Sequence, residues 1–328
     1  MKIKGLLLGS AAAVVMAGGA TAADLPAAAP ADYVMICGDF SQAYVIPGTD
    51  VCLDIGGMVS FEVDVTRAGG ATTVAYSTDA DVYLTASTAT EYGALIVHIE
   101  LEADDIVATQ TTGASALMYD DVYIQFGGDL FVKAGYYDGV GDVGDDLATT
   151  DGTGQGDTVG MGYGSGALSF AVDVLLDSDN VTAGNAIEGV GAHASYAVND
   201  NLSVAVMGSF ALAASPAGVA AGGAVAGAGV EVSYTMDALS VLAAAAFSNG
   251  GAGANVFGGR VKVSYAVTDA LSVYVDGEYQ NVAASNYHVD AGVDYTVTSG
   301  LVVGANAGVA EVAGASSIMF GVDATRSF

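Results

Sequence analysis

The sequence predicts an all-β protein, a closed transmembrane antiparallel β-barrel of about 16 strands with an inward-folded third loop. Three observations support the barrel: apolar and polar residues alternate along most of the chain, tyrosines recur at the ends of alternate strands, and the last residue is aromatic. Of the 328 residues, 52% are hydrophobic and 13% are charged, about half the charge of a usual soluble domain. The composition therefore argues against an ordinary cytosolic enzyme.

The first 22 residues are typical of a secretory signal peptide. Lys2 and Lys4 precede an apolar run from Gly5 to Ala17, and Ala20–Ala22 has the small residues of a cleavage site. A retained membrane anchor is the alternative, but the apolar run is short for a helix that spans a bilayer. We expect the mature chain to begin at Ala23.

Residues 23–52 are expected to form an N-terminal periplasmic segment before a barrel over residues 53–328. This segment holds both cysteines of the chain, Cys37 and Cys52. In an oxidising compartment, an even pair separated by a turn predicts a disulfide, which would stabilise the closed loop by about 3 kcal/mol. A two-cysteine metal site is the alternative, but no histidine lies near this pair in the sequence.

Strands are predicted by a period of two. From Leu53 to Thr66 the odd positions are apolar or Gly, whereas the even positions are mostly polar. A soluble β-sandwich also alternates, so the period alone does not indicate a membrane. Sixteen such runs occur, near 53–66, 74–88, 92–105, 116–127, 130–138, 157–164, 167–177, 187–198, 201–213, 224–236, 238–248, 254–267, 270–282, 286–298, 300–312 and 316–328.

The spacing of tyrosines favours a membrane barrel over a soluble β-repeat. Five tyrosines each precede, by five or six residues, a leucine that opens the next run: Tyr163, Tyr196, Tyr234, Tyr265 and Tyr295. They are 33, 38, 31 and 30 residues apart, the length of one hairpin with its loop. An aromatic ring at the end of every second strand suits the membrane interface, where one side of the ring is wet.

The connections between runs differ in length on the two sides of the predicted barrel. Short turns include Gly128-Asp129, Asn199-Asp200 and Thr298-Ser299. Periplasmic turns are short and extracellular loops are long in such barrels. Longer loops are expected near 67–73, 106–115, 139–157, 178–186 and 214–223.

One uncharged segment offers a different interpretation. Residues 201–230 carry no charged side chain, so a transmembrane helix is the alternative there. Apolar and small residues alternate from Leu202 to Leu212, and Pro216 with a Gly/Ala stretch follows. This pattern favours a strand that ends in a loop.

The last run resembles the signal that the outer-membrane assembly machinery recognises. Phe320 and Val322 alternate with polar or small residues toward the C-terminal Phe328. Soluble secreted proteins have no need of such an ending, so the assembly machinery is an expected partner.

Two blocks of sequence resemble the porin family of alphaproteobacteria: residues from Ala31 to Gly57 and the ending Arg326-Ser327-Phe328. The resemblance is close over residues 1–60 and the last dozen, and elsewhere it follows the strand pattern. It implies a sixteen-stranded barrel, a homotrimer, contact with outer-membrane lipid and lipopolysaccharide, and passive diffusion of small hydrophilic solutes without a cofactor. Such porins usually set basic residues on the wall against an acidic loop, and this chain has few basic residues.

The resemblance also implies that the third loop narrows the passage. In this chain that loop is the longest connection, and its glycines permit tight folding. A calcium-binding loop is the alternative, but the spacing of its acids does not fit an EF-hand. Its carboxylates are Asp138, Asp142, Asp145, Asp146, Asp151 and Asp157.

If the apolar face of each strand meets lipid, the polar face lines the lumen. The bases on that face are Lys133, Arg260 and Lys262. The acids and histidines in the same phase are Asp54, Glu62, Asp64, His98, Glu100, Glu102, Asp104, Asp173, Asp276, Glu278, His288, Asp290, Asp294 and Asp323. We interpret the two histidines as solvated imidazoles in preference to metal ligands or catalytic bases.

Charge excludes one partner class and predicts selectivity. The chain has 37 acids against 7 bases and a net charge of -30, which repels nucleic acid. An acidic lumen concentrates cations, so we expect cation selectivity. The alternative is that the acids only keep the lumen and loop tips hydrated.

Two function classes remain, because the sequence lacks the usual motifs of hydrolases, metalloproteases and phosphate-binding enzymes. The first is a diffusion pore. The second is a structural or adhesive barrel with a blocked lumen. Gly, Ser, Ala and acids at the inward positions favour a lumen filled with water.

Overall fold

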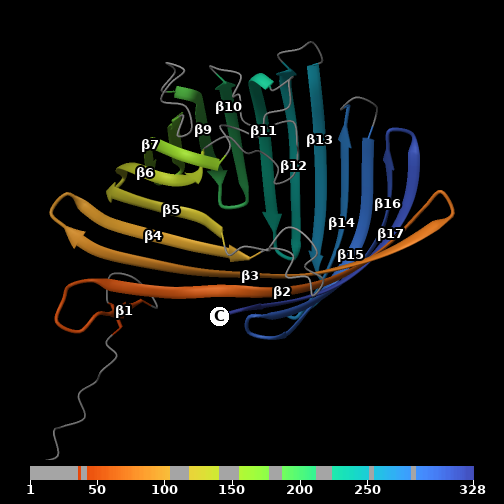
Figure 1. Ribbon diagram of the computed structural model, residues 1–328, viewed down its shortest axis with the longest axis horizontal. Coiled ribbons are helices and arrows are strands. Elements are labelled where there is room, and N and C mark those ends of the chain that lie inside the picture. Colours follow the sequence, from red (N-terminus) through yellow and green to blue (C-terminus); the bar gives the residue numbers. More distant parts are fainter. Residues whose placement is uncertain are drawn as a thin grey trace, which may run out of the picture.

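A computed structural model describes residues 36–37, 43–103, 118–139, 155–176, 187–211, 224–250, 255–281 and 286–328. The strands in these ranges form one antiparallel sheet that curves until its last strand lies beside its second (Figure 1). Within these ranges, no helix has the length and apolar character needed to cross a membrane. The predicted signal peptide, residues 1–22, lies outside the described residues.

The sheet closes into the predicted barrel of 16 strands, β2 to β17, because β17 pairs with β2 from Ser317↔Ala68 to Ser327↔Met58. A short additional strand, β1, pairs only with the start of β2. The strands are β1 (Tyr44–Val45), β2 (Cys52–Ala68), β3 (Ala71–Thr90), β4 (Gly93–Ala103), β5 (Met118–Gly127), β6 (Leu130–Asp138), β7 (Gln155–Ser165), β8 (Leu168–Leu176), β9 (Ile187–Asn199), β10 (Leu202–Ala211), β11 (Ala224–Met236), β12 (Leu239–Gly250), β13 (Asn255–Ala266), β14 (Leu271–Gln280), β15 (Asn286–Thr298), β16 (Leu301–Val312) and β17 (Ala315–Ser327).

Two sequence interpretations are settled by these strands. The helix alternative for residues 201–230 is wrong, because β10 and the start of β11 occupy its described part. The loop expected over 67–73 is also wrong, because β2 and β3 extend through it and Ala68 pairs with Ala71. Gly69 and Gly70 form the turn between them with φ of +59° and +87°, which a two-residue hairpin turn requires.

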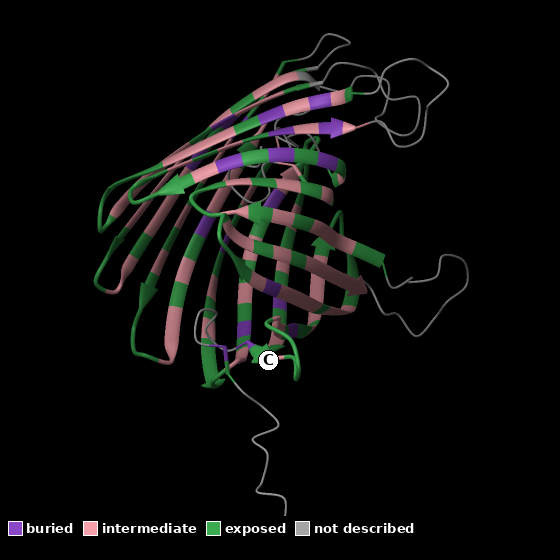
Figure 2. Ribbon diagram, turned by 90° about the vertical axis from the view of Figure 1, so that its left-hand side faces the viewer, coloured by how far each residue is buried: buried purple, intermediate pink, exposed green. Residues whose placement is uncertain are grey.

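The outer face of the barrel is apolar between two aromatic bands. Exposed residues alternate with less exposed ones along the strands (Figure 2). On β13, Phe257 and Tyr265 are 48% and 52% exposed and lie eight positions apart, as do Tyr287 and Tyr295 on β15. At about 3.3 Å per residue, eight positions span about 26 Å along a strand, which suits the height of the apolar band of an outer-membrane barrel.

The tyrosine repeat follows from strand pairing. Five leucines that open strands lie across from the tyrosine near the end of the neighbouring hairpin, so the two side chains share the outer face at the short-turn end. The pairs are Leu130↔Tyr163, Leu168↔Tyr196, Leu202↔Tyr234, Leu239↔Tyr265 and Leu271↔Tyr295. Leu301, the next in the series, pairs with Arg326.

Both ends of the described chain are tied to β2. The predicted disulfide is confirmed: Cys37 is bonded to Cys52, with Cα atoms 5.9 Å apart. Val45 of β1 pairs with Cys52, which adds backbone hydrogen bonding beside the disulfide. At the other end, the backbone of Phe328 exchanges two hydrogen bonds with Gly57, at 3.2 and 3.0 Å between N and O.

Candidate functional site

The polar side chains that the sequence assigned to the pore wall share one face of the sheet. On each strand these residues alternate with the exposed apolar residues of the outer face, so they point to the opposite side of the sheet. They are Glu62 and Asp64 on β2, Glu100 and Glu102 on β4, Lys133 on β6, Arg260 and Lys262 on β13, and Asp276 and Glu278 on β14. Asp104 lies outside the described residues.

Carboxylates gather where the barrel closes. Glu62 pairs with Asp323 across the β17–β2 seam, and Asp323 and Asp294 both pair with Gly304 of the strand between them. We call Asp294, Asp323 and Glu62 the acidic row. A row of like charges across neighbouring strands creates a negative potential, which attracts cations to this part of the wall.

Two further acids beside this row were missing from the sequence interpretation. Asp79 on β3 accepts hydrogen bonds from Ser60 and Ser77 at 3.3 and 3.4 Å. Asp81 lies across from Glu102 on β4. The run that became β3 is rich in Thr, Ser and Ala, so its apolar and polar faces are poorly distinguished in the sequence.

The three bases predicted for the wall are each engaged by a neighbouring side chain. Arg260 donates hydrogen bonds to both oxygens of Asp276. Lys133 places its Nζ 3.8 and 3.7 Å from the ring centroids of two tyrosines, and Lys262 places its Nζ 5.0 Å from that of Tyr274. Ion pairing and cation–π contact hold these cations against the wall.

An aromatic band crosses the inner face from β3 to β6. Tyr83, His98, Tyr123 and Tyr137 lie on successive strands, with ring centroids 6.2, 5.0 and 5.9 Å apart. Tyr137 is 1% exposed, and its hydroxyl donates to Asp173 Oδ1 at 3.5 Å. The sequence interpretation assigned recurrent tyrosines to the membrane interface and missed this second, inward set.

The predicted constriction loop is only partly described. Asp142, Asp145, Asp146 and Asp151 lie outside the described residues. Asp138 is the last residue of β6, and Asp157 is an exposed residue inside β7 in place of the expected loop position. Both alternate in phase with outward apolar residues such as Val132 and Val159, so neither points toward the lumen.

The comparison with protein families identifies the group to which the barrel belongs. The porin subfamily matches residues 24–321, nearly the whole chain. The chain belongs to this family. The match confirms the resemblance drawn from the N-terminal block and the C-terminal ending, and it agrees with the expectation that the chain is not an enzyme.

Curated relatives of the porin match shorter stretches. Porin Omp2a of Brucella ovis is 49% identical over 67 residues, 19% of this chain and 19% of the relative. The putative outer membrane protein y4fJ of Sinorhizobium fredii is 35% identical over 153 residues, 42% of this chain and 43% of the relative. The chain thus aligns with less than half the length of each of these relatives.

Among solved structures, the anion-selective porin from Comamonas acidovorans has a TM-score of 0.65 and 13% identity, covering 85% of this chain and 100% of that one. A likeness at this identity establishes the fold. Together with the family and the relatives, it places the porin in the outer membrane of a Gram-negative bacterium, which it crosses with its strands.

Proposed function

We propose that this porin forms a water-filled channel for passive diffusion of small hydrophilic solutes, and that the channel prefers cations. The main support for cation preference is the acidic row. In this row, Glu62 and Asp323 lie across from each other at the β17–β2 seam, so two negative charges lie close together. The bases of the wall are engaged by Asp276 or by aromatic rings, which limits the positive potential that they offer to an anion.

We infer the sign of the preferred ion from the side chains of the wall, because the fold by itself does not determine whether a porin prefers cations or anions. A structural neighbour at 13% identity is an anion-selective porin. A unit charge about 4 Å from one carboxylate interacts with it by about 1 to 4 kcal/mol, depending on how well water screens the pair. A difference of about 1.4 kcal/mol corresponds to a factor of ten in local concentration, so several carboxylates suffice for cation preference.

The test is the reversal potential of the purified porin in a planar bilayer with a KCl gradient. We expect a potential of cationic sign in low salt and a smaller one near 1 M, where the Debye length falls to about 3 Å. A potential of zero or anionic sign in low salt would contradict cation preference. A barrel that inserts without conducting would favour the alternative of a structural or adhesive barrel with a blocked lumen.

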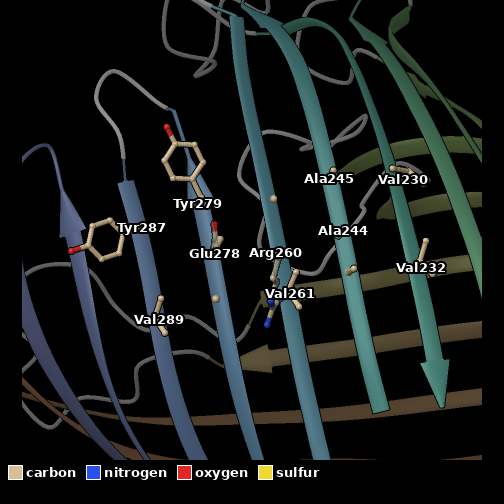
Figure 3. Close-up of a pocket in the computed structure, with 13 residues that line it drawn as sticks. Val230, Val232, Ala244, Ala245, Arg260, Val261, Glu278, Tyr279, Tyr287 and Val289 are labelled. Atoms are coloured by element: carbon tan, nitrogen blue, oxygen red, sulfur yellow. The ribbon is translucent and has the colours of Figure 1, made fainter. Parts of the chain in front are cut away.

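The homotrimer implied by the family resemblance is a further part of this proposal. A depression of about 580 Å³ lies over β11 to β15, and most of the residues that line it belong to the outer face (Figure 3). Its lining includes the small residues Ala243, Ala245, Gly259 and Gly277, and small residues let neighbouring barrels approach closely. Mass measurement in mild detergent tests the assembly, and a monomer would contradict it.

Recognition by the outer-membrane assembly machinery is also proposed. Phe320 and Val322 are 53% and 52% exposed on the outer face of β17, and Phe328 directly follows this strand. A segment with this pattern offers its aromatic side chains to a partner before the barrel closes. We expect Phe328→Ala to lower the amount of folded porin in the outer membrane, and an unchanged amount would contradict the proposal.

A further inference from the structure

Three potential metal ligands converge on the inner wall between β4 and β5. His98 and Glu100 lie two positions apart on β4 and therefore on the same face, and Asp121 comes from β5. One ligand atom from each residue lies within 4.8 Å of the other two. His98 Nε2 and Glu100 Oε2 are 3.4 Å apart.

Asp121 lies across from Glu100 beside a β-bulge. His98 pairs with Tyr123 and Leu101 pairs with Tyr119, so Glu100 faces two residues of β5 where a regular ladder has one. Bulges change the direction of side chains and are common next to functional sites. The regular register of His98↔Tyr123 and Ile99↔Val122, continued by one residue, places the carboxylate of Asp121 across from Glu100, next to the bulge.

The imidazole of His98 is held in one orientation by groups outside the cluster. Its Nδ1 lies 2.8 Å from Thr85 Oγ1, and its ring stacks against Tyr123 with centroids 5.0 Å apart. When Nδ1–H donates to Thr85, the lone pair of Nε2 faces Glu100. Such outer hydrogen bonds fix the tautomer and the ring direction of metal-binding histidines.

We propose that His98, Glu100 and Asp121 form a binding site for a divalent transition-metal cation, with Zn²⁺ as the best fit. One imidazole nitrogen with two carboxylates suits Zn²⁺, whereas Mg²⁺ and Ca²⁺ prefer ligand sets made of oxygen. Ligand atoms about 2.1 Å from a tetrahedral Zn²⁺ lie about 3.4 Å apart, which the His98–Glu100 pair already matches. A small rotation of Asp121 completes three protein ligands and leaves one position for water.

The site adjoins the root of the third loop. Asp121 Oδ1 accepts a hydrogen bond of 3.3 Å from the backbone nitrogen of Asp138, the last residue of β6. A bound divalent cation would cancel the charge of two carboxylates on the inner wall. We therefore expect zinc to reduce the cation preference of the channel. This effect on conductance rests on the proposed function, but the binding of zinc to the site does not depend on it.

Calorimetric titration of the chelator-washed, detergent-solubilised porin with ZnCl₂ tests the site. We expect one Zn²⁺ per chain and a loss of affinity of about tenfold or more in His98→Gln and in Asp121→Asn. His193→Gln is the matched control and should bind like the wild type, because His193 lies on the face of β9 opposite to the exposed Tyr196. Zinc-edge X-ray absorption should show one imidazole nitrogen with oxygen ligands.

The proposed site would be wrong if the wild type did not bind zinc. It would also be wrong if His98→Gln bound zinc with the affinity of the wild type, or if the His193→Gln control lost as much zinc affinity as His98→Gln. Asp121→Asn preserves the size of the side chain, so it tests the site even if His98→Gln fails to fold. Zinc binding without any effect on conductance would leave the site in place and count only against the link to the channel.

Discussion

Arg260 on β13 holds the carboxylate of Asp276 on β14 with two of its nitrogens. Nε lies 3.1 Å from both carboxylate oxygens, and Nη2 lies 2.7 Å from Oδ2. The two side chains are 13% and 12% exposed. This forked, largely buried contact fixes both groups and neutralises the guanidinium. The acids at the β17–β2 seam therefore share the wall with an arginine, Arg260, whose charge is already paired with Asp276.

Replacing Arg260 by Gln should destabilise the barrel and raise its cation preference. The change leaves the carboxylate of Asp276 largely buried without its ion pair, which costs about 1–3 kcal/mol. It also removes a positive charge from the wall. The unfolding temperature in mild detergent and the reversal potential measure the two effects. Arg67→Gln, at the exposed end of β2, is the matched control. If Arg260→Gln and this control had the same unfolding temperature and the same reversal potential, the prediction would be wrong.

Replacing Gly57 by Ala should weaken barrel closure. Gly57 exchanges backbone hydrogen bonds with Phe328, and a Cβ there would overlap the carbonyl oxygen of Asp81 and lie 2.9 Å from the Phe328 ring. Overpacking of this kind costs about 1–3 kcal/mol. Heat-dependent mobility on a denaturing gel reports the temperature at which the barrel opens. Gly164→Ala is the control, because its Cβ would have no neighbour closer than 3.9 Å. Equal opening temperatures would count against this account.

Removing the disulfide should release the N-terminal segment without opening the barrel. Only two residue pairs join β1 to β2, Tyr44↔Leu53 and Val45↔Cys52, so the bond to Cys37 carries much of the attachment. In the chain-entropy model, loss of the disulfide lowers the stability of the closed loop by about 3 kcal/mol. In a double variant, Cys37→Ser with Cys52→Ser, we expect faster proteolysis of residues 46–50 and an unchanged opening temperature of the barrel. A large fall of that temperature would show that the segment supports the whole sheet.

The strands were predictable because period-two patterning is a local property. The predicted ranges 130–138, 224–236 and 286–298 coincide with β6, β11 and β15. The β2–β3 connection was not predictable, because Thr and Gly residues at 67–73 are typical of a loop. The two-residue turn there depends on positive φ at Gly69 and Gly70 and on the register of the paired strands.

The candidate sites were predictable only within single strands. Alternation assigns Glu62 and His98 each to a face, but the pairing of Glu62 with Asp323 depends on barrel closure between opposite ends of the chain. Asp121 was not assigned to the wall, although it has the same phase as Tyr123 on β5. Its proximity to His98 is a property of the cross-strand register, which no local pattern contains.

Neutralising the acidic row should lower cation selectivity. Glu62→Gln with Asp323→Asn removes two charges that face each other across the seam while preserving side-chain size. We expect the K⁺/Cl⁻ permeability ratio in low salt to fall by about threefold to tenfold, as the loss of roughly 1 kcal/mol of attraction implies. Asp157→Asn is the control, because that residue is exposed in phase with the outer face of β7. If the control lowers the ratio as much, overall charge and not the row sets the selectivity.

The third loop can be tested separately from the wall. Asp142, Asp145 and Asp146 belong to the segment that the family resemblance assigns to the constriction, and their replacement by Asn removes three charges. Carboxylates in a narrow passage act on every ion at short range and with less screening by water. We therefore expect the triple variant to lower the K⁺/Cl⁻ ratio at 1 M KCl, where distant wall charges are screened, as well as in low salt. A fall confined to low salt would place these acids away from the narrowest point. An unchanged ratio at both concentrations would remove the loop from the conduction path and leave selectivity to the acidic row.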